Sequence, residues 1–198
     1  MARFVMEFER PLADLEEKLA ALANLDIAST PELAAEIADL EREVERLRAT
    51  LYSTLSPWEK VQVSWHPDRP KTVDYVAYLF DDVVELRGDR RFADDQAMYT
   101  ALATLGGRRV VVIGHNKGHT TKENVARNFG SPHPEGLRKA ERAMRLADRF
   151  GLPIVTFLDT AGASPGLEDE ERGQAWAIAD CLATLSAVRV PVVVVGIG

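Results

Sequence analysis

Apolar residues recur at helical spacing twice in the first 51 residues. In residues 11–25 leucines stand at positions 12, 15, 19 and 22, which places them on one face of a helix. In residues 31–51 the apolar positions are 37, 40, 44, 47 and 51, in alternating steps of three and four. Thr30 can cap the second helix, and Pro31 suits its first turn. We expect an antiparallel helical hairpin or a short coiled coil.

Two further helices are expected before residue 90. The pair Ser56-Pro57 favours a helix start, and a proline-rich turn ends that segment near residue 70. Residues 71–89 predict a second helix that stops at Gly88. Its apolar face would contain Val73, Val76, Phe80, Val83 and Val84.

The pattern changes after residue 98. Two β-type runs, 99–105 and 108–117, flank Gly106-Gly107, which predicts a hairpin with a two-residue turn. Helices are expected at residues 120–130, 134–151 and 169–188, and buried strands, apolar on both faces, at residues 152–159 and 190–198. The inward positions of the 134–151 helix would be Leu137, Ala140, Met144 and Ala147. Strands that alternate with helices favour βαβ crossovers and a parallel sheet, so the fold class is α/β.

Charge and composition narrow the class of protein. The 198 residues carry a net charge of −7, with a pI near 5.2, so we expect neither nucleic acid nor an anionic membrane as partner. No signal peptide opens the chain and no apolar run has the length of a membrane span, so a cytoplasmic location is expected. The single cysteine, Cys181, is interpreted as a small buried hydrophobe. His115 and His119 stand at a strand exit, which argues against a zinc pair, and we expect no metal site in this chain.

The loops that follow the strands are the candidate ligand sites, because parallel sheets bind ligands beyond the carboxyl ends of their strands. The stretch FLDTAGASPGLEDEERGQ leaves a buried strand at Asp159 and continues through small residues. Backbone N–H groups at Gly162, Ala163 and Gly166 can approach a ligand and form an anion or oxyanion site. The alternative is a plain glycine turn between a strand and a helix.

Charged residues near these loops have two interpretations as well. Lys117, Lys122 and Arg127 can attract an anionic substrate or can be solvated surface charge. The acidic run 168–171 fits the N-terminus of a helix better than it fits a general base. Ser164 does not stand in a G-x-S-x-G elbow, and neither GxGxxG nor GxxxxGK[ST] is present.

Several long motifs carry a resemblance to a known family. They are FERPLADLEEKL near the start, HPDRPKTVDYV (66–76), FADD (92–95), GHNKGHTTKENVARNFG (114–130), PHPEGLRKAERAMRLADRFGLPIVTFLDT (132–160) and EERGQAWAIA (170–179). In this order they resemble the α subunit of bacterial acetyl-CoA carboxylase carboxyltransferase over nearly the whole chain. The resemblance implies a crotonase-like (ClpP/crotonase) ββα spiral core. We expect an N-terminal helical hairpin in residues 1–55 and an incomplete crotonase-like domain in residues 56–198.

The resemblance also implies an activity and its partners. The reaction would transfer a carboxyl group from carboxybiotin, carried on a separate biotin carboxyl carrier protein, to acetyl-CoA. The product, malonyl-CoA, is the first committed intermediate of fatty acid synthesis. The assembly would be an α₂β₂ heterotetramer, within an ATP-dependent complex, in which zinc belongs to the β subunit.

The matching motifs assign the expected binding residues. Substrate or biotin binding is expected at Lys117, Gly118, Lys122, Asn124, Gly162, Ala163, Gly166 and Arg172. Catalysis would rest on backbone amides, with Gly162 and Ala163 as candidates, and on no side-chain acid or base. The chain departs from the family at Ala161, Ser164, His119 and Ser131, where proline, tyrosine, arginine and methionine are usual.

The resemblance also implies that the family's sequence continues beyond residue 198, and two rival functions stay open. The family continues with G-E-G-G-S-G-G-A, whose glycines carry the biotin oxyanion role, so this chain is expected to be a fragment of a longer gene product or to end where order ends. Activity of the 198 residues alone is not expected. The rivals are another crotonase-type acyl-CoA enzyme, such as a hydratase, isomerase or decarboxylase, and an interaction module without catalysis.

Overall fold

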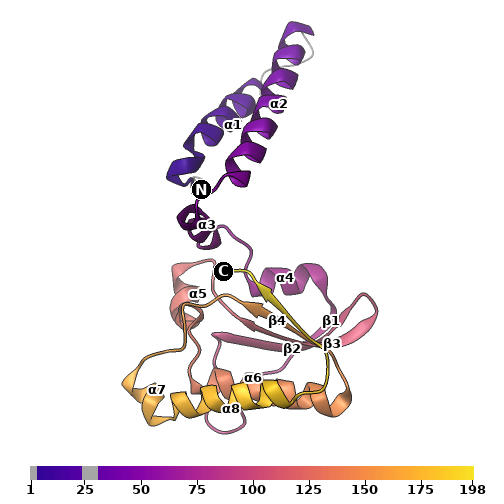
Figure 1. Cartoon of the computed structure of the whole chain (residues 1–198), viewed down its shortest axis with the longest axis vertical. Helices are drawn as coiled ribbons and strands as arrows, with labels where there is room; N and C mark the ends of the chain where they lie inside the picture. Colours follow the sequence, from indigo (N-terminus) through magenta and orange to yellow (C-terminus); the bar gives the residue numbers. More distant parts are fainter. Residues whose placement is uncertain (1–3, 24–30) are drawn as a thin grey trace. The chain divides into compact units, whose positions relative to one another are not determined.

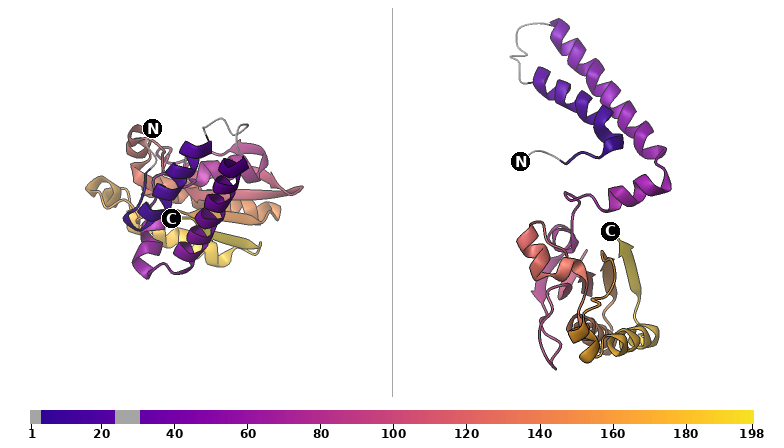
Figure 2. Two further views of the ribbon diagram at one scale, coloured as in Figure 1. Left: turned by 90° about the horizontal axis from the view of Figure 1, so that it is seen from above. Right: turned by 90° about the vertical axis from the view of Figure 1, so that its left-hand side faces the viewer.

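The computed structural model describes residues 4–23 and 31–198 and divides the chain into two compact units, Met1–Asp68 and Arg69–Gly198. The first unit contains a short 3-10 turn, η1 (Glu7–Glu9), followed by α1 (Arg10–Ala23), α2 (Pro31–Ser53) and α3 (Pro57–Ser64). Helices α1 and α2 pack side by side (Figures 1 and 2). The predicted helical hairpin is therefore confirmed, and α2 begins at Pro31 as expected. The proposed cap at Thr30 lies outside the described residues.

The apolar stripes of α1 and α2 face each other, as their spacing predicts. Leu12 and Val44 are buried, and the other stripe positions are half-buried while most intervening residues are exposed. Arg48 of α2 bridges the helices through its ion pair with Glu16 of α1, at 2.7 Å. At α3, the Glu59 N–H donates to Ser56 Oγ at 3.3 Å and the Ser56 N–H donates to Glu59 Oε2 at 2.7 Å. This capping box confirms the predicted helix start.

The second unit is built on a five-stranded sheet in the order β1-β2-β3-β4-β5. The strands are β1 (Asp81–Glu85), β2 (Met98–Leu105), β3 (Arg108–His115), β4 (Ile154–Leu158) and β5 (Val192–Gly196). Strands β1, β2 and β3 pair antiparallel, whereas β3, β4 and β5 pair parallel. The predicted parallel sheet thus holds for the last three strands only. The turn glycines have φ of +53° at Gly106 and +79° at Gly107, the conformation that a two-residue hairpin turn requires.

Helices cover both faces of this sheet. The helical elements are α4 (Thr72–Leu79), α5 (Thr121–Ala126), η3 (Asn128–Gly130), α6 (Pro134–Phe150), α7 (Leu167–Glu171) and α8 (Gln174–Ala187). Along β3, Val110 and Val112 pack in the cluster that contains α4 residues, and Val111 and Ile113 pack in the cluster that contains α6 residues. This alternation has the period of two that a strand buried on both faces shows. Helix α8 packs beside α6 (Figure 1).

Three sequence predictions are wrong in detail. The helix expected over 71–89 ends at Leu79, and the chain then turns into β1. Asp82 has φ of +50° and the β1–β2 register shifts between Asp81 and Val84. This β-bulge allows β1 to pair with β2. Pairing with β2 is non-local and overrides the helical spacing. Gly88, at φ +73°, lies in the loop after β1 and ends no helix.

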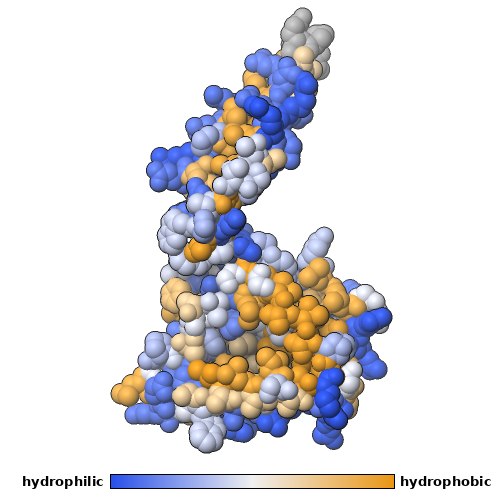
Figure 3. All heavy atoms as spheres, viewed as in Figure 1, coloured by the Kyte–Doolittle hydropathy of each residue, from blue (hydrophilic) through white to orange (hydrophobic). Residues whose placement is uncertain are grey.

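The helix expected over 169–188 is two helices. Gly173 has φ of +83°, a left-handed conformation that ends α7 and precedes α8. The strand expected over 190–198 is present as β5, but it is not buried on both faces. Val193 and Val194, whose side chains point to opposite faces of the strand, are 54% and 56% exposed, and β5 stands at the edge of the sheet. Figure 3 shows apolar side chains gathered over this side of the unit.

Candidate functional site

The loops that follow β3 and β4 meet at one edge of the sheet. Because these strands are parallel neighbours, both loops leave from their carboxyl ends. The Lys117 ammonium after β3 lies 2.6 Å from Oδ1 of Asp159 after β4, and the Asp159 side chain is 5% exposed. A charge-assisted hydrogen bond of this length at a largely buried carboxylate ties the two loops together. We call this region the carboxyl edge.

The loop after β3 is held by its own polar groups. The Gly118 N–H donates to Oδ1 of Asn124 at 2.9 Å, and a Cβ at position 118 would lie 2.3 Å from the Cβ of Glu123. Nη1 of Arg127 donates to the carbonyl of Lys117 at 2.8 Å. Gly118, Asn124 and Arg127 therefore shape the loop that presents Lys117. Lys122 is exposed on α5.

The first turn of α4 is fastened to the same edge. The Thr72 hydroxyl donates to the carbonyl of His115, the last residue of β3. Asp74 accepts a hydrogen bond from the Lys71 N–H at 2.7 Å and pairs with Nε2 of His119 at 2.8 Å. His119, where the resemblance leads us to expect an arginine, thus makes a polar contact with α4.

Two groups at this edge, the buried Lys71 and the half-buried His115, were not among the predicted site residues. Lys71 is 9% exposed, and burial lowers the pKa of its ammonium while the charge of Asp159 opposes that shift. Burial also lowers the pKa of His115, against a backbone hydrogen bond with Phe157 and the charge of Asp159. In the sequence, Lys71 stands inside the HPDRPKTVDYV motif, and the position of His115 bears only on the zinc pair argued against above. Neither spacing nor composition distinguishes a buried lysine from an exposed one.

The loop after β4 exposes Gly162. This residue has φ of +143°, and a Cβ added there would meet no atom within 4 Å. Its N–H donates to Thr160 Oγ1 at 3.0 Å, and the Thr160 hydroxyl lies 3.0 Å from the Gly162 carbonyl. Ala163 is half-buried. The loop is open at Gly162, but the Gly162 amide hydrogen is engaged within the loop in this conformation.

Ser164 and Gly166 belong to a buried network that ends this loop. The Ser164 hydroxyl donates to Oδ2 of Asp169 at 2.5 Å, and His133 Nδ1 lies 2.7 Å from Oδ1 of Asp169. Asp169 thus stands between the serine and the histidine, so His133 does not activate Ser164 as a nucleophile. A Cβ at Gly166 would lie 2.8 Å from Asp169 Oδ2, so the glycine makes room for the carboxylate.

Arg172 joins the same network. Its Nη2 donates to Asp169 at 2.8 Å and its Nε donates to Glu135 at 2.9 Å. Burial raises the pKa of Asp169, but the hydrogen bonds of Ser164 and His133 and the charge of Arg172 outweigh it and hold that pKa below its usual value. The structure therefore places Arg172 with buried carboxylates, and Asp169 does more than complement a helix dipole.

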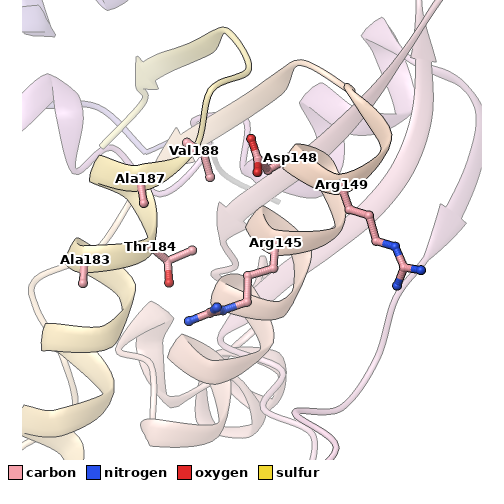
Figure 4. Close-up of a pocket in the computed structure, with 7 residues that line it drawn as sticks. All are labelled: Arg145, Asp148, Arg149, Ala183, Thr184, Ala187 and Val188. Atoms are coloured by element: carbon pink, nitrogen blue, oxygen red, sulfur yellow. The ribbon is translucent and has the colours of Figure 1, made fainter.

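One surface hollow lies beside the carboxyl edge and another lies at the opposite edge of the sheet. One of about 190 Å³ borders the loop after β3, with Tyr99, Asn116 and Arg127 among its lining residues. Another of about 400 Å³ lies between α6 and α8 (Figure 4), at the helix ends that lead into β4 and β5. That position is the amino edge of the parallel strands, opposite the carboxyl edge, so we do not assign the chemistry to it.

No metal site or membrane span is found in the part of the chain that the structure describes. Residues 4–23 and 31–198 hold no group of three or more histidine, cysteine or acidic side chains that could bind a metal ion. Within the same residues no helix has the length and apolar character needed to cross a membrane.

Sequence comparison identifies close relatives. The family model described as "Acetyl co-enzyme A carboxylase carboxyltransferase-like" matches residues 5–198. Acetyl-coenzyme A carboxylase carboxyl transferase subunit alpha of Thermus thermophilus is 52% identical over 193 residues, covering 98% of this chain and 61% of the relative. The subunit of the same name from Sorangium cellulosum is 52% identical over 198 residues, covering 100% and 62%. The chain thus spans about 61% of the length of these curated relatives.

Solved structures show the fold. A crystal structure of transcarboxylase 12S matches 65% of this chain and 23% of its own, with a TM-score of 0.54 and 23% identity. The β subunit of P. aeruginosa geranyl-CoA carboxylase matches 64% of this chain and 22% of its own, with a TM-score of 0.51 and 20% identity. The expected crotonase-like fold is confirmed by these neighbours.

Proposed function

Because this chain belongs to the acetyl-CoA carboxylase carboxyltransferase-like family, we propose that it forms part of a carboxyltransferase α subunit. The reaction is transfer of a carboxyl group from carboxybiotin to acetyl-CoA, which yields malonyl-CoA for fatty acid synthesis. The carboxybiotin is carried by a separate carrier protein. The shared motifs and the identity of about 50% to subunits of that name support this proposal.

The proposal includes partners. We expect a β subunit that completes an α₂β₂ heterotetramer and carries zinc, and a cytoplasmic location for the complex. The relatives' name, subunit alpha, supports assembly with at least one other kind of subunit.

The carboxyl edge is the proposed place of reaction in this chain. When bound, biotin supplies the transferable carboxyl group. Lys117 would attract that anion, and Gly118 and Asn124 would keep the lysine loop in place. The open loop at Gly162 and Ala163 would let the ligand approach the backbone. Lys122 would add positive charge at the rim, while Arg172 would hold the Asp169 network that ends the loop.

One observation supports the carboxyl edge as the place of reaction. The loops after two neighbouring parallel strands meet through Lys117 and Asp159, 2.6 Å apart, at the edge where sheets of this kind bind ligands. The residues fit an anionic group, because the ammonium of Lys117 lies at this edge and the charge of Lys117 acts on Lys71, which is 9% exposed.

The test is carboxyl transfer by the full-length protein. The protein is purified with the proposed β partner, and malonyl-CoA formation is measured with carboxylated carrier protein and acetyl-CoA. Turnover that requires the partner and carboxybiotin is the expected result. Turnover of an enoyl-CoA by the chain without biotin would establish a different crotonase-type enzyme instead. Assembly with the partner but no turnover of either substrate would establish an interaction module.

A further inference from the structure

The loop after β4 is held at both ends by the segment between β3 and α6. At its start, Oδ1 of Asp159 lies 2.6 Å from the Lys117 ammonium. At its end, the Ser164 N–H donates to the carbonyl of Pro132 at 3.0 Å, and Pro132 is fully buried. Residues 160–163 therefore form a short bridge between two anchored residues.

Gln174, the first residue of α8, fastens the second of these anchors. Its Nε2 donates to the carbonyl of Pro132 at 2.9 Å and to the carbonyl of Ser164 at 3.0 Å, and the residue is 2% exposed. Two carbonyl oxygens can be bound only by the NH₂ end of a side-chain amide, so chemistry fixes the orientation of this group. Gln174 follows Gly173, whose φ of +83° separates α7 from α8. We call these two hydrogen bonds the Gln174 clamp.

The buried amide is not the side chain that stability alone favours at this position. Oε1 of Gln174 has no hydrogen-bond partner among residues 4–23 and 31–198. A buried polar atom without a partner raises the free energy of the folded state, and this cost offsets the gain from the two donated hydrogen bonds. We therefore expect the clamp to contribute little net stability while it fixes the positions of two carbonyl groups.

The clamp acts next to the candidate oxyanion groups. Gly162 and Ala163 directly precede Ser164, and no hydrogen bond of the Ala163 N–H is found in the described part of the chain. A shift of Ser164 would therefore move this free donor relative to Lys117. Misplacement by about 1 Å can lower a rate about 10²-fold. We infer that Gln174 is a positioning residue for carboxyl transfer, because its clamp holds the loop that contains Ala163. This inference rests on the proposed function for the identity of the reaction.

The test compares Gln174→Met with wild type in the full-length protein, purified with its proposed β partner. Methionine keeps an unbranched stem of similar length and removes both donors. In malonyl-CoA formation we expect kcat to fall roughly tenfold, less than the ~10²-fold that a full shift of about 1 Å can cost. KM for acetyl-CoA and for the carboxylated carrier should stay near wild type. The melting temperature should change little, because the unpaired Oε1 is removed together with the two donors.

Thr184→Val is the matched control. Thr184 is a buried polar residue of the same helix, and its hydroxyl lies 3.5 Å from Oε1 of Glu141 on α6. Valine has nearly the same shape and removes that contact while the hydrogen bonds of the loop after β4 stay in place. This variant should keep the wild-type kcat. Equal losses of kcat in Thr184→Val and Gln174→Met would show that any buried change in α8 slows turnover, and would overturn the inference.

Amide hydrogen exchange reports on the clamp without turnover. In Gln174→Met, residues 159–166 should exchange faster than in wild type, because the hydrogen bond from the Ser164 N–H to Pro132 opens more often, while β3 and β4 should keep their protection. Unchanged exchange in residues 159–166, or equally faster exchange across the second compact unit, would overturn the inference. If Gln174→Met does not fold, Gln174→Asn is measured instead, because its amide is one methylene shorter and cannot span both carbonyls.

Turnover and exchange together separate this inference from the proposed function. If wild type transfers carboxyl groups, and Gln174→Met exchanges faster in residues 159–166 but has a normal kcat, the clamp holds the loop without positioning it for the reaction, and this inference alone is wrong. If wild type transfers none, the proposed function is wrong, and the exchange measurement still decides whether Gln174 holds the loop.

Discussion

The ammonium of Lys139, on α6, lies 2.6 Å from Oδ1 of Asp94 in the loop between β1 and β2. It also donates to the Asp95 carbonyl at 2.6 Å, and Lys139 is 1% exposed. The side chain of Lys139, inside α6, thus anchors the β1–β2 loop through an ion pair and a hydrogen bond. The acidic pair of the FADD motif is explained by this contact and by the His133 N–H, which donates to Asp95 Oδ2 at 2.8 Å.

Replacing this lysine should destabilise the second compact unit. Breaking a buried ion pair costs about 3–5 kcal/mol, and because Asp94 is 32% exposed and can be solvated, we expect roughly 2–4 kcal/mol for Lys139→Met. Urea unfolding followed by circular dichroism measures this change. Arg145→Met, whose partner Glu141 is on the same helix and whose own side chain is 67% exposed, should cost less than about 1 kcal/mol. Equal losses in both variants would contradict the anchoring role.

Ser164→Ala should lower stability and leave carboxyl transfer nearly intact. The Ser164 hydroxyl is buried and donates to Asp169, which keeps its contacts with His133 and Arg172 when the hydroxyl is removed. A hydrogen bond to a charged group is worth about 1.5–3 kcal/mol. The midpoint of urea unfolding and the rate of malonyl-CoA formation are compared with wild type. A loss of turnover at unchanged stability would assign the serine a chemical role instead.

Gly162→Val should reduce turnover through the backbone. The glycine has φ of +143°, and no atom lies within 4 Å of an added Cβ, so strain and bulk at the open face are the only effects. Removing an oxyanion donor costs about 10²–10³ in rate, and we expect less, roughly tenfold, because no donor is deleted. The control is Gly151→Val at φ +65° after α6, which is also unobstructed but lies before β4 at the other end of that strand. It should be strained but catalytically normal, and equal rates in the two variants would exclude the loop from the site.

His115 should make the protein sensitive to mild acid. Burial lowers the pKa of its ring in the folded state, with Asp159 opposing and Lys117 reinforcing the shift. The unfolded chain therefore binds a proton at higher pH than the folded chain, so stability falls as pH drops through the ordinary histidine pKa of about 6.5. The loss is complete once pH is below the folded pKa.

Replacing His115 isolates this contribution. In His115→Gln the free energy of unfolding should vary less between about pH 7.5 and pH 5 than in wild type. The measurement is urea unfolding at half-unit pH steps. The variant His66→Gln, in the first compact unit, should keep the wild-type dependence. If the free energy of unfolding fell more steeply with acid in His115→Gln than in wild type, the burial of His115 would not be the cause of the acid sensitivity.

Local pattern was enough for much of the fold. The helical spacing of the stripes, the Gly106-Gly107 turn and the two-sided apolar runs each predict an element that the structure contains. The errors lie where distant pairing decides, as in β1, which forms because β2 offers a partner across a bulge. The break at Gly173 was also missed, because spacing cannot tell a glycine inside a helix from one that ends it.

The candidate site was less accessible from sequence. Loop positions followed from the strand order, so Lys117 and the small residues after Asp159 could be selected. Lys71 and Thr72 could not, because the contact of the first turn of α4 with the end of β3 is a side-chain hydrogen bond between residues 43 positions apart. Arg172 looked like a ligand-binding cation, and only the positions of Glu135 and Asp169 reveal its contacts.

The mixed pairing of the sheet also bears on the order in which the site can assemble. Strands β2 and β3 are joined by two residues, whereas the parallel pair β3 and β4 is joined through residues 116–153, which include α6. Closing the longer connection costs more chain entropy and slows the pairing that depends on it. Lys117 and Asp159 meet only after that closure, so the hairpin by itself brings none of the ligand-binding groups together. We therefore expect the β2–β3 hairpin to form before the parallel pairing that completes both hydrophobic clusters and the carboxyl edge.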